Sequence, residues 1–398
     1  MAQSTTRLPT HQKTPPISKA GAADDGPITP SGDGDQWWLM KDDLQCLIDS
    51  LWAAGYQVIG PKVESAAIVY AEIRDQNELP KGWTEEQSPG KYRLKRRDDD
   101  HLFGFNVGPH SWKSYLFPPH AVVATADRTP QGWQMRDADD PEKPFAFLGV
   151  RACELAAMAV QDRTFIHDHY IDPIYAARRQ TAMIIAVNCT QAASTCFCTS
   201  MNTGPRCLTG FDLALTEVDQ GFTIEIGSSR GRQIIGGVPV RPLSHDQVDQ
   251  AEVARSHATA EMTKRLDTTD IRNLLLENLD HPRWADVGNR CLSCTNCTMV
   301  CPTCFCHSVT DVSDLSGDHV DRVRQWDSCF NSNFSYMNGG LVRGDTRSRY
   351  RQWLTHKLAS WIDQFDTSGC VGCGRCITWC PVGIDLTEEV AAIREDVR

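Results

Sequence analysis

The chain has 398 residues, enough for two or three domains of ordinary size. Its 40 Lys and Arg against 51 Asp and Glu give a formal net charge of -11, which excludes the basic surplus that general nucleic-acid binding requires. The longest apolar runs, residues 66–71 and 182–187, fall far short of the roughly 18 residues that a membrane-spanning helix needs, so no membrane association is expected.

The segment 1–36 is rich in Pro, Ser, Thr, Gly and Asp and has few large apolar side chains. Such a segment buries too little surface to order itself, and we predict a disordered tail. It shows neither an apolar signal region nor a twin-arginine pair, which predicts a cytoplasmic protein. In a reducing cytoplasm the 17 cysteines are not expected to form a disulfide framework.

Residues 37–250 are predicted to form an α/β domain. Apolar residues at helical spacing predict a helix over 44–51, and apolar runs predict strands over 66–73 and 122–125. The Gly- and Pro-rich stretch 79–119 between these strands is long for a loop, so it is either locally folded or functional.

The segment 145–188 has the order of a βαβ unit. A short apolar run at 145–150 is followed by a helical pattern at 153–161 and a continuous apolar run at 182–187. The second strand is expected to be buried on both faces, as in a parallel sheet. Alternating apolar and polar residues over 211–226, with a turn in the middle, predict a hairpin.

Cysteines crowd the C-terminal part of the chain, where eleven of the 17 lie after residue 290. Buried core cysteines would scatter with the core, so the crowding indicates ligands. The string CxxCxxCxxxCP occurs twice, at Cys291, Cys294, Cys297 and Cys301 and again at Cys370, Cys373, Cys376 and Cys380. This is the bacterial iron-sulfur run, in which three close thiolates bind one cubane and the fourth cysteine usually binds the partner cluster.

Two such runs predict two 4Fe-4S clusters with crossed ligands. The first cluster is assigned to Cys291, Cys294, Cys297 and Cys380. The second is assigned to Cys370, Cys373, Cys376 and Cys301. A zinc site needs two CxxC pairs separated by about 12 to 20 residues, so the packed runs favour iron-sulfur over zinc.

The two runs are too far apart for a compact small ferredoxin, and helices are expected to fill the interval between them. An amphipathic pattern over 271–279, ended by Pro282, predicts a further helix before the first run. We therefore expect an α/β N-terminal domain, followed over 260–398 by a mostly α-helical C-terminal dicluster ferredoxin domain.

A third cysteine group is expected at the edge of the parallel sheet. Cys153 follows the first strand of the βαβ unit and Cys189 follows the second, so both should lie at the carboxyl edge, where ligands collect. Cys196 and Cys198 follow in a loop that can fold back over that edge. These four thiolates predict a third cluster, with Cys207 as an alternative fourth ligand and ordinary buried cysteines as the competing interpretation.

The remaining cysteines carry weaker signals. Cys304, Cys306 and Cys329 follow the first run, and packing beside a cluster is favoured over another metal site. Cys46 is most simply a residue of the helix core. A basic stretch can supply counter-charge to the net negative clusters, although a solvated helix face is an equal interpretation; it comprises Arg343, Arg347, Arg349, Arg351 and Lys357.

Motifs for substrate chemistry are not visible. There is no GxGxxG fingerprint after a strand and no GxxxxGK[ST] loop, so no cofactor-binding residues are named for a nucleotide. No Ser-His-Asp or Cys-His constellation stands out, and no catalytic residues are assigned. One-electron centres without a site for substrate chemistry indicate an electron-transfer protein, and whether it is itself an enzyme stays open. An iron-sulfur sensor or a zinc-stabilised interaction module is the alternative of a different class.

The chain resembles the iron-sulfur β subunit of cytoplasmic NAD(P)-linked nickel-iron hydrogenases of the sulfhydrogenase type, which are kin to the electron-input subunit of anaerobic sulfite reductase. The resemblance covers about residues 37 to 390 and rests on an ordered set of segments. These include Gly149-Val150-Arg151-Ala152-Cys153-Glu154, Asn188-Cys189, Cys196-Phe197-Cys198, Cys301-Pro302-Thr303-Cys304-Phe305-Cys306, Trp326-Asp327-Ser328-Cys329 and Cys370-Val371-Gly372-Cys373-Gly374-Arg375-Cys376. Ala152 and Glu154 depart from the Pro-Cys-Asp that we expect the family to favour.

The resemblance implies electron transfer between a flavin subunit that handles NAD(P) and the small and large subunits of a nickel-iron hydrogenase. In the sulfite reductase alternative, the same chain would feed electrons to a sirohaem subunit. Cluster potentials vary widely with environment, so the direction of electron flow does not follow from the sequence.

Overall fold

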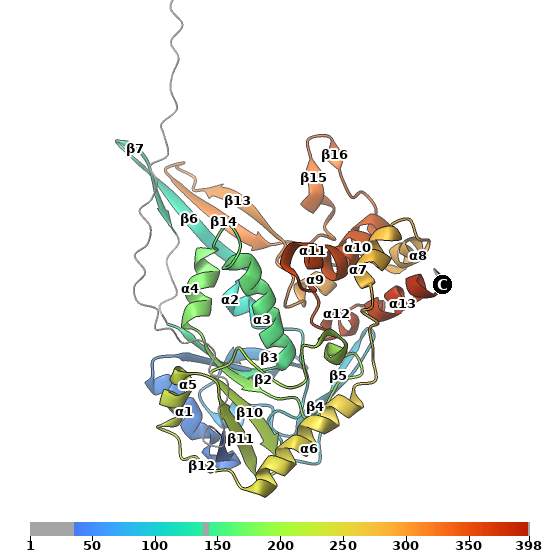
Figure 1. Ribbon diagram of the computed structural model, residues 1–398. Coiled ribbons are helices and arrows are strands. Elements are labelled where there is room, and N and C mark those ends of the chain that lie inside the picture. The colour runs from blue at the N-terminus through green and yellow to red at the C-terminus, as the bar shows by residue number, and fades with distance from the viewer. Residues whose placement is uncertain (1–35, 138–142, 397–398) are drawn as a thin grey trace, which may run out of the picture.

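The computed structural model describes residues 36–137 and 143–396, and the predicted tail at 1–36 lies outside them except for its last residue (Figure 1). A mixed eight-stranded sheet is the centre of the N-terminal part, with the strand order β12-β1-β11-β10-β9-β8-β2-β3. Its strands are β1 (Gln36–Met40), β2 (Gln57–Glu64), β3 (Ala67–Glu72), β8 (Phe145–Val150), β9 (Met183–Val187), β10 (Leu213–Val218), β11 (Gly221–Ile226) and β12 (Arg241–Pro242).

The middle of this sheet is parallel, as the βαβ pattern predicts. β8 pairs with β9 in parallel, with Phe147 opposite Ile184, and β2 and β10 extend the parallel part on either side. The helix α3 (Ala152–Phe165) follows β8, and the unpredicted α4 (Pro173–Thr181) precedes β9. β10 and β11 form the predicted antiparallel hairpin. The α/β fold class of the N-terminal part is therefore confirmed.

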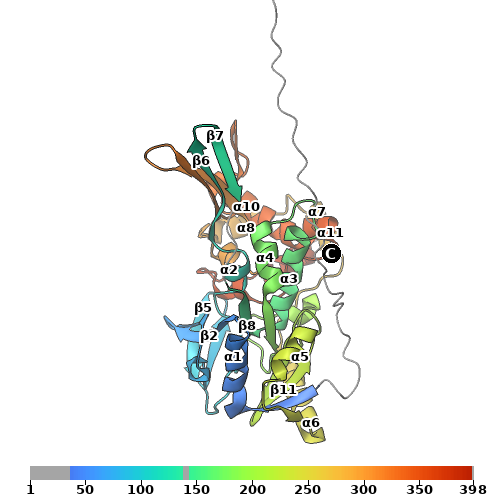
Figure 2. The same ribbon diagram turned by 90° about the vertical axis from the view of Figure 1, so that its left-hand side faces the viewer.

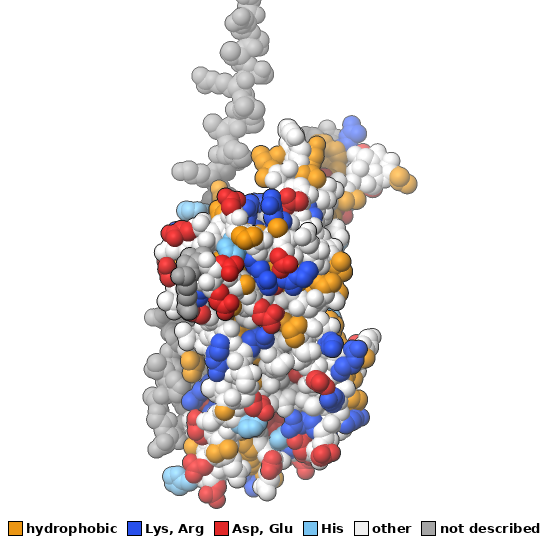
Figure 3. All heavy atoms as spheres, turned by 90° about the vertical axis from the view of Figure 1, so that its right-hand side faces the viewer, with side chains coloured by type: hydrophobic (Ala, Val, Ile, Leu, Met, Phe, Trp, Pro, Cys, Tyr) orange, Lys and Arg blue, Asp and Glu red, His pale blue; other side chains and the backbone are white. Residues whose placement is uncertain are grey.

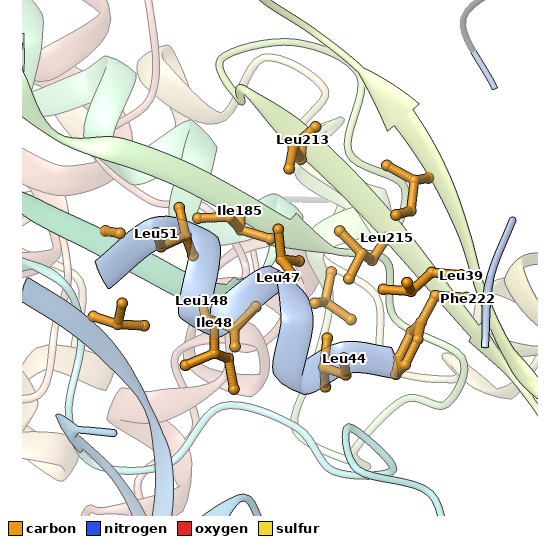
Figure 4. Close-up of a cluster of buried hydrophobic side chains, with 14 of the residues drawn as sticks. Leu39, Leu44, Leu47, Ile48, Leu51, Leu148, Ile185, Leu213, Leu215 and Phe222 are labelled. Atoms are coloured by element: carbon orange, nitrogen blue, oxygen red, sulfur yellow. The ribbon is translucent and has the colours of Figure 1, made fainter. Parts of the chain in front are cut away.

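Helices cover both faces of the sheet. Along β9, Met183, Ile185 and Val187 pack into the core on the side of α1 (Leu44–Ala53) and α5 (Ser229–Ile235). Leucines and an isoleucine of α1 lie over this face (Figure 4). The alternate residues Ile184 and Ala186 pack with residues of α3 and α4 on the other side. β9 is therefore buried on both faces, which explains its continuous apolar sequence.

Further elements lie between or after the strands of this sheet. The stretch 79–119 is locally folded, because it holds the hairpin of β4 (Trp83–Ser88) and β5 (Lys91–Arg96) and the short α2 (Lys113–Leu116). The helix α6 (His245–Glu261) packs Ala251 against the sheet residue Trp38 and passes through residue 250, where we predict the end of the first domain.

The C-terminal part has its own apolar core, built mainly from helices. These are α7 (Ile271–Glu277), α8 (Arg283–Arg290), α9 (Asn296–Met299), α10 (Thr346–Thr355), a π-helical turn (His356–Ser360), α11 (Trp361–Phe365), α12 (Arg375–Thr378) and α13 (Leu386–Asp396). The helix predicted at 271–279 corresponds to α7. This part is not wholly helical, because β13 (His307–Ser313) and β14 (His319–Trp326) form a hairpin and β15 (Tyr336–Met337) pairs with β16 (Gly340–Leu341).

The hairpin of β13 and β14 shares a sheet with the N-terminal part. β14 pairs with β6 (His120–Thr129), and β6 pairs with β7 (Gly132–Asp137), giving the order β13-β14-β6-β7. This four-stranded sheet projects away from the rest of the molecule in two perpendicular views (Figures 1 and 2). The interval between the cysteine runs contains helices, as expected, but it also contains this hairpin. Val309, Thr310 and Val312 precede the Asp314–Gly317 turn, and Val320 and Val323 follow it, which favours a hairpin at this point.

The distribution of charged side chains on the surface agrees with the acidic composition of the chain. On the face drawn in Figure 3, acidic and basic side chains are interspersed and form no large patch of one sign. In the described residues, no helix is both long enough and apolar enough to span a bilayer.

Candidate iron-sulfur centres

Cys291, Cys294 and Cys297 of the first run line one cavity together with Cys380, and Cys376 of the second run lines it as well. Cys291 directly follows α8, Cys297 lies in α9, and Cys380 comes from the second run. Aromatic and aliphatic side chains form the walls of this cavity; they include Phe330, Tyr350, Trp353, Ile384 and Leu386. Cys294 is exposed, so one edge of the group lies at the protein surface. The structure thus brings together the four residues assigned to the first cluster.

Backbone amides approach two sulfurs of this first group. The Ser293 N–H donates to Cys291 Sγ at 3.5 Å, and the Ile384 N–H donates to Cys380 Sγ at 3.3 Å. Hydrogen bonds to ligand sulfurs are one of the means by which a protein sets a cluster potential.

The second run lies with Cys301. Burial raises the pKa of Cys376, and the neighbouring thiols Cys370, Cys373 and Cys301 raise it further. The four side chains assigned to the second cluster therefore lie within electrostatic reach of one another. In the structure Cys301 lies near the second run and Cys380 lies near the first.

A buried lysine faces the second group. Lys357 Nζ lies 3.2 Å from Cys301 Sγ, 3.0 Å from Thr303 Oγ1 and 3.0 Å from the Gly369 carbonyl oxygen. Lys357 is only 5% exposed, so its ammonium group is held where a net negative cluster would lie. Of the basic stretch named from the sequence, Lys357 is the residue in contact with a predicted ligand.

The third group forms at the carboxyl edge of the parallel sheet. Cys153 lies in the first turn of α3 after β8, and Cys189 follows β9. Burial raises the pKa of Cys198, and the nearby thiols Cys196 and Cys189 raise it further. Cys153 in turn lies near Cys198. The structure brings together all four residues predicted for the third cluster.

Cys207 lies differently from the four residues of the third group. It is buried in the apolar core that includes Phe147 and Phe211, and its N–H donates to Asn188 Oδ1 at 2.7 Å. Cys153, Cys196 and Cys198 instead share a separate cluster with Cys373. This placement favours Cys153 over Cys207 as the fourth member of the group. Cys46 packs against the core of the N-terminal sheet, as expected.

The loop that carries Cys196 and Cys198 lies against the loop of the second run. The Phe197 N–H donates to the Gly372 carbonyl oxygen at 2.8 Å. A Cβ at Gly372 would lie 2.7 Å from the backbone of Cys198, and one at Gly374 would lie 2.5 Å from the Thr195 carbonyl oxygen. Both glycines also have positive φ, 65° and 75°. Glycine is therefore needed at both positions for the conformation and for the close approach of the two loops.

A buried ion pair joins the second run to α3. Arg375, within the second run, donates from Nη2 to Glu154 Oε1 at 2.6 Å, and each side chain is almost fully buried. Glu154 Oε2 accepts hydrogen bonds from Tyr70, Trp112 and the backbone N–H of Arg151. Glu154 directly follows Cys153, so the pair connects the third group to the second.

The three groups lie one after another. Cys373 of the second group is close enough to act electrostatically on Cys153, Cys196 and Cys198 of the third. Cys301 of the second group acts in the same way on Cys297 of the first. The series therefore runs from the sheet edge through the second group to the exposed edge at Cys294.

The chemistry of these thiols suits iron-sulfur clusters. Burial raises the pKa of Cys370 to about 12, so this thiol would stay protonated at neutral pH without a metal, and bound iron would favour its thiolate. In the described residues, no three His, Cys, Asp or Glu side chains come close enough to share a single metal ion. The cysteines of the two ferredoxin runs are among the side chains to which this applies. Their spacing is compatible with clusters, because each thiolate of a 4Fe-4S cubane binds a different iron.

The residues that hold α3 against the second run are not apparent from the sequence pattern. Glu154 and Arg375 appear in the motifs of the resemblance, but their contact joins distant parts of the chain. An acidic residue directly after Cys153 and an arginine inside a cysteine run are the signals that could have suggested an ion pair.

Comparison with known proteins agrees with this geometry. Residues 290–384 match the family of 4Fe-4S dicluster domains. The chain is 29% identical over 260 residues to sulfhydrogenase 2 subunit beta of Pyrococcus furiosus, an alignment that covers 64% of this chain and 76% of that protein. No solved structure matches the chain. The resemblance to iron-sulfur β subunits of sulfhydrogenases is confirmed.

Proposed function

We propose that this homologue of a sulfhydrogenase β subunit, with its 4Fe-4S dicluster domain, relays electrons through three 4Fe-4S clusters. The clusters would connect a flavin subunit that handles NAD(P) with the small and large subunits of a nickel-iron hydrogenase. The observation that supports a relay is the continuous series of three cysteine groups, which ends at the exposed Cys294. An electron-transfer protein needs such a series with at least one end near the surface.

The proposed ligands follow the three groups. The first cluster takes Cys291, Cys294, Cys297 and Cys380, and the second takes Cys370, Cys373, Cys376 and Cys301. The third takes Cys153, Cys189, Cys196 and Cys198. Bound clusters supply one-electron carriers, and the protein supplies the sulfur ligands, the amides that face Cys291 and Cys380, and the ammonium group of Lys357.

The proposed partners rest on the relative. Sulfhydrogenase 2 subunit beta is by its name one subunit of a hydrogenase, and we infer that this chain also works within such a complex. A cytoplasmic location belongs to the same proposal, because a reducing compartment keeps the free cysteines available for iron.

Anaerobic isolation of the native complex with a tag on this chain tests the partners. Nickel and flavin should co-purify with the chain in fixed proportion. A complex with sirohaem and no nickel would replace the hydrogenase by a sulfite reductase. Isolated chain with stoichiometric zinc and little iron would contradict electron transfer altogether.

Cysteine variants test the third cluster. Cys189→Ala should lose about four irons and four acid-labile sulfides per chain, because a 4Fe-4S cluster is lost. Cys207→Ala is the matched control, since Cys207 lies near Cys189 but packs in the apolar core. Unchanged iron in Cys189→Ala, or loss of iron only in Cys207→Ala, would show that the proposed ligand set is wrong.

The crossed ligation has its own test. Cys380→Ala should alter the EPR signal of the cluster bound by Cys291, Cys294 and Cys297, with the signal of the other ferredoxin cluster preserved. Selective damage to the cluster held by the second run would mean that the runs do not exchange their fourth ligands.

A further inference from the structure

Three cysteines outside the proposed clusters line a single open cavity. Cys304, Cys306 and Cys329 all face a cavity of about 520 Å³ that opens to solvent. They come from two segments of the chain, and the sequence favours packing beside a cluster for all three. Thiols that crowd together at an accessible cavity suit metal binding better than apolar packing.

The fold explains why these cysteines meet. Cys306 immediately precedes β13 and Cys329 follows β14, and the hairpin pairs His307 with Trp326 at its base. The Asp327 N–H donates to the Cys306 carbonyl oxygen at 2.8 Å, which fixes the two segments side by side. In Figure 1 this base of the hairpin lies beside the helical C-terminal part. The hairpin that breaks the expected helical pattern is thus the element that assembles the three thiols.

Positive charge surrounds the three thiols. Lys357 and Arg343 line the cavity, and Asp168 is the one carboxylate among its described lining residues. Lys113 lies on the other side of Cys304, with its Nζ 3.0 Å from the Cys304 carbonyl oxygen and 3.8 Å from the centre of the Trp326 ring.

Lys113 has no carboxylate partner among the described residues, although it is only 4% exposed. Its polar contacts are the carbonyl oxygens of Cys304 and Met299. A buried ammonium group is costly unless negative charge faces it. Lys357 already lies beside Cys301 of the second group. The buried ammonium group of Lys113 therefore indicates that a further negatively charged group lies on the side of Cys304.

The position of the three thiols also links them to the proposed relay. Cys304 lies next to Cys301 of the second group, and Cys329 lies within electrostatic reach of Cys297 of the first. A redox centre bound here would lie beside both ferredoxin clusters and would face solvent through the cavity.

We propose that Cys304, Cys306 and Cys329 bind three irons of a fourth 4Fe-4S cluster, whose remaining iron faces the open cavity. The net negative charge of such a cluster accounts for the surrounding cations. An iron without a protein thiolate can take a small anion from solvent, and Lys357 and Arg343 provide a cationic wall for it. This site goes beyond the proposed three-cluster relay.

Metal analysis of the anaerobically prepared full chain is the first test. Wild-type protein should contain about sixteen irons and sixteen sulfides, four more than three clusters provide. Cys306→Ser and Cys329→Ser should each lose about four of both. Cys46→Ser is the control, because Cys46 lies in α1 against the N-terminal core. Iron and sulfide that are unchanged in both variants, or the loss of one zinc instead, would overturn the proposal.

A second measurement uses the wild-type chain and does not depend on folding of the variants. A 4Fe-4S cluster with one iron lacking a thiolate readily loses that iron on mild oxidation. Ferricyanide titration should therefore release one iron per chain and produce one three-iron EPR signal. Absence of that signal would overturn the three-thiolate site. Unchanged iron in Cys306→Ser and Cys329→Ser alongside a loss in Cys189→Ala would reject this site and leave the three-cluster relay intact.

Discussion

The ion pair between Glu154 and Arg375 gives a prediction about how the two parts of the molecule are held together. Glu154→Gln removes the negative charge but keeps the size of the side chain. Arg375 is 1% exposed, and its other contacts are the carbonyl oxygens of Gly108 and His110. The substitution would leave a buried guanidinium without a carboxylate, which typically costs about 3 to 5 kcal/mol.

This cost can be converted into a change of melting temperature. A chain of 398 residues that unfolds as one unit has an unfolding entropy of roughly 0.8 kcal/mol/K. Loss of 3 to 5 kcal/mol would then lower Tm by about 4 to 6 °C. The assay is an anaerobic thermal scan at one fixed rate, with iron content measured for each sample so that cluster loss is not mistaken for lost pairing.

Two controls sharpen the measurement. Asp311→Asn removes the carboxylate of an exposed pair with Arg322, which solvent screens, and should leave Tm nearly unchanged. The double variant Glu154→Gln with Arg375→Met removes both charges, and its destabilisation should be smaller than the sum of the two single effects. A Glu154→Gln variant no less stable than Asp311→Asn would refute the role of this pair.

Two further predictions concern the proposed second cluster. Gly372→Ala should destabilise the chain by more than about 1 to 2 kcal/mol, because its positive φ is compounded by a Cβ contact at 2.7 Å. Gly317→Ala, with φ of 73° and open space around the Cβ, isolates the conformational cost, and equal losses in thermal scans of the two variants would contradict the close-contact argument. Lys357→Met should lower the potential of the second cluster by tens of millivolts, because the ammonium group at Cys301 Sγ favours the reduced, more negative state. EPR-monitored redox titration measures this shift, and a potential that stays constant or rises would contradict it.

Much of the site could be predicted because its information is local. The spacing within each cysteine run specifies three neighbouring ligands, and the βαβ pattern places Cys153 and Cys189 at one sheet edge before any tertiary contact is known. The proposed roles of Cys301 and Cys380 rest on the additional rule that the fourth cysteine of a run usually binds the other cluster. The 4Fe-4S dicluster family and the α/β fold class follow from such local patterns.

The unpredicted features depend on contacts between distant segments. Whether Lys357 touches a ligand or points to solvent is decided by the π-helical turn that carries it, which a charge pattern does not reveal. Cys306 and Cys329 meet only because the intervening residues form a hairpin where helices were expected. The strands of this hairpin are short and half-exposed, so their local sequence stabilises them only weakly. The pairing of β14 with β6 supplies the additional stabilisation.

The four-stranded sheet also has a consequence for biosynthesis. β6 leaves the ribosome early, but its partner β14 is made only after the βαβ unit, the next hairpin and the first cysteine run. During that time the edge of β6 has unpaired backbone groups, which can associate with other nascent chains. Division of the gene near residue 250 would make this state permanent in the N-terminal fragment. The growing chain therefore exposes this edge of β6 until β14 has been synthesised.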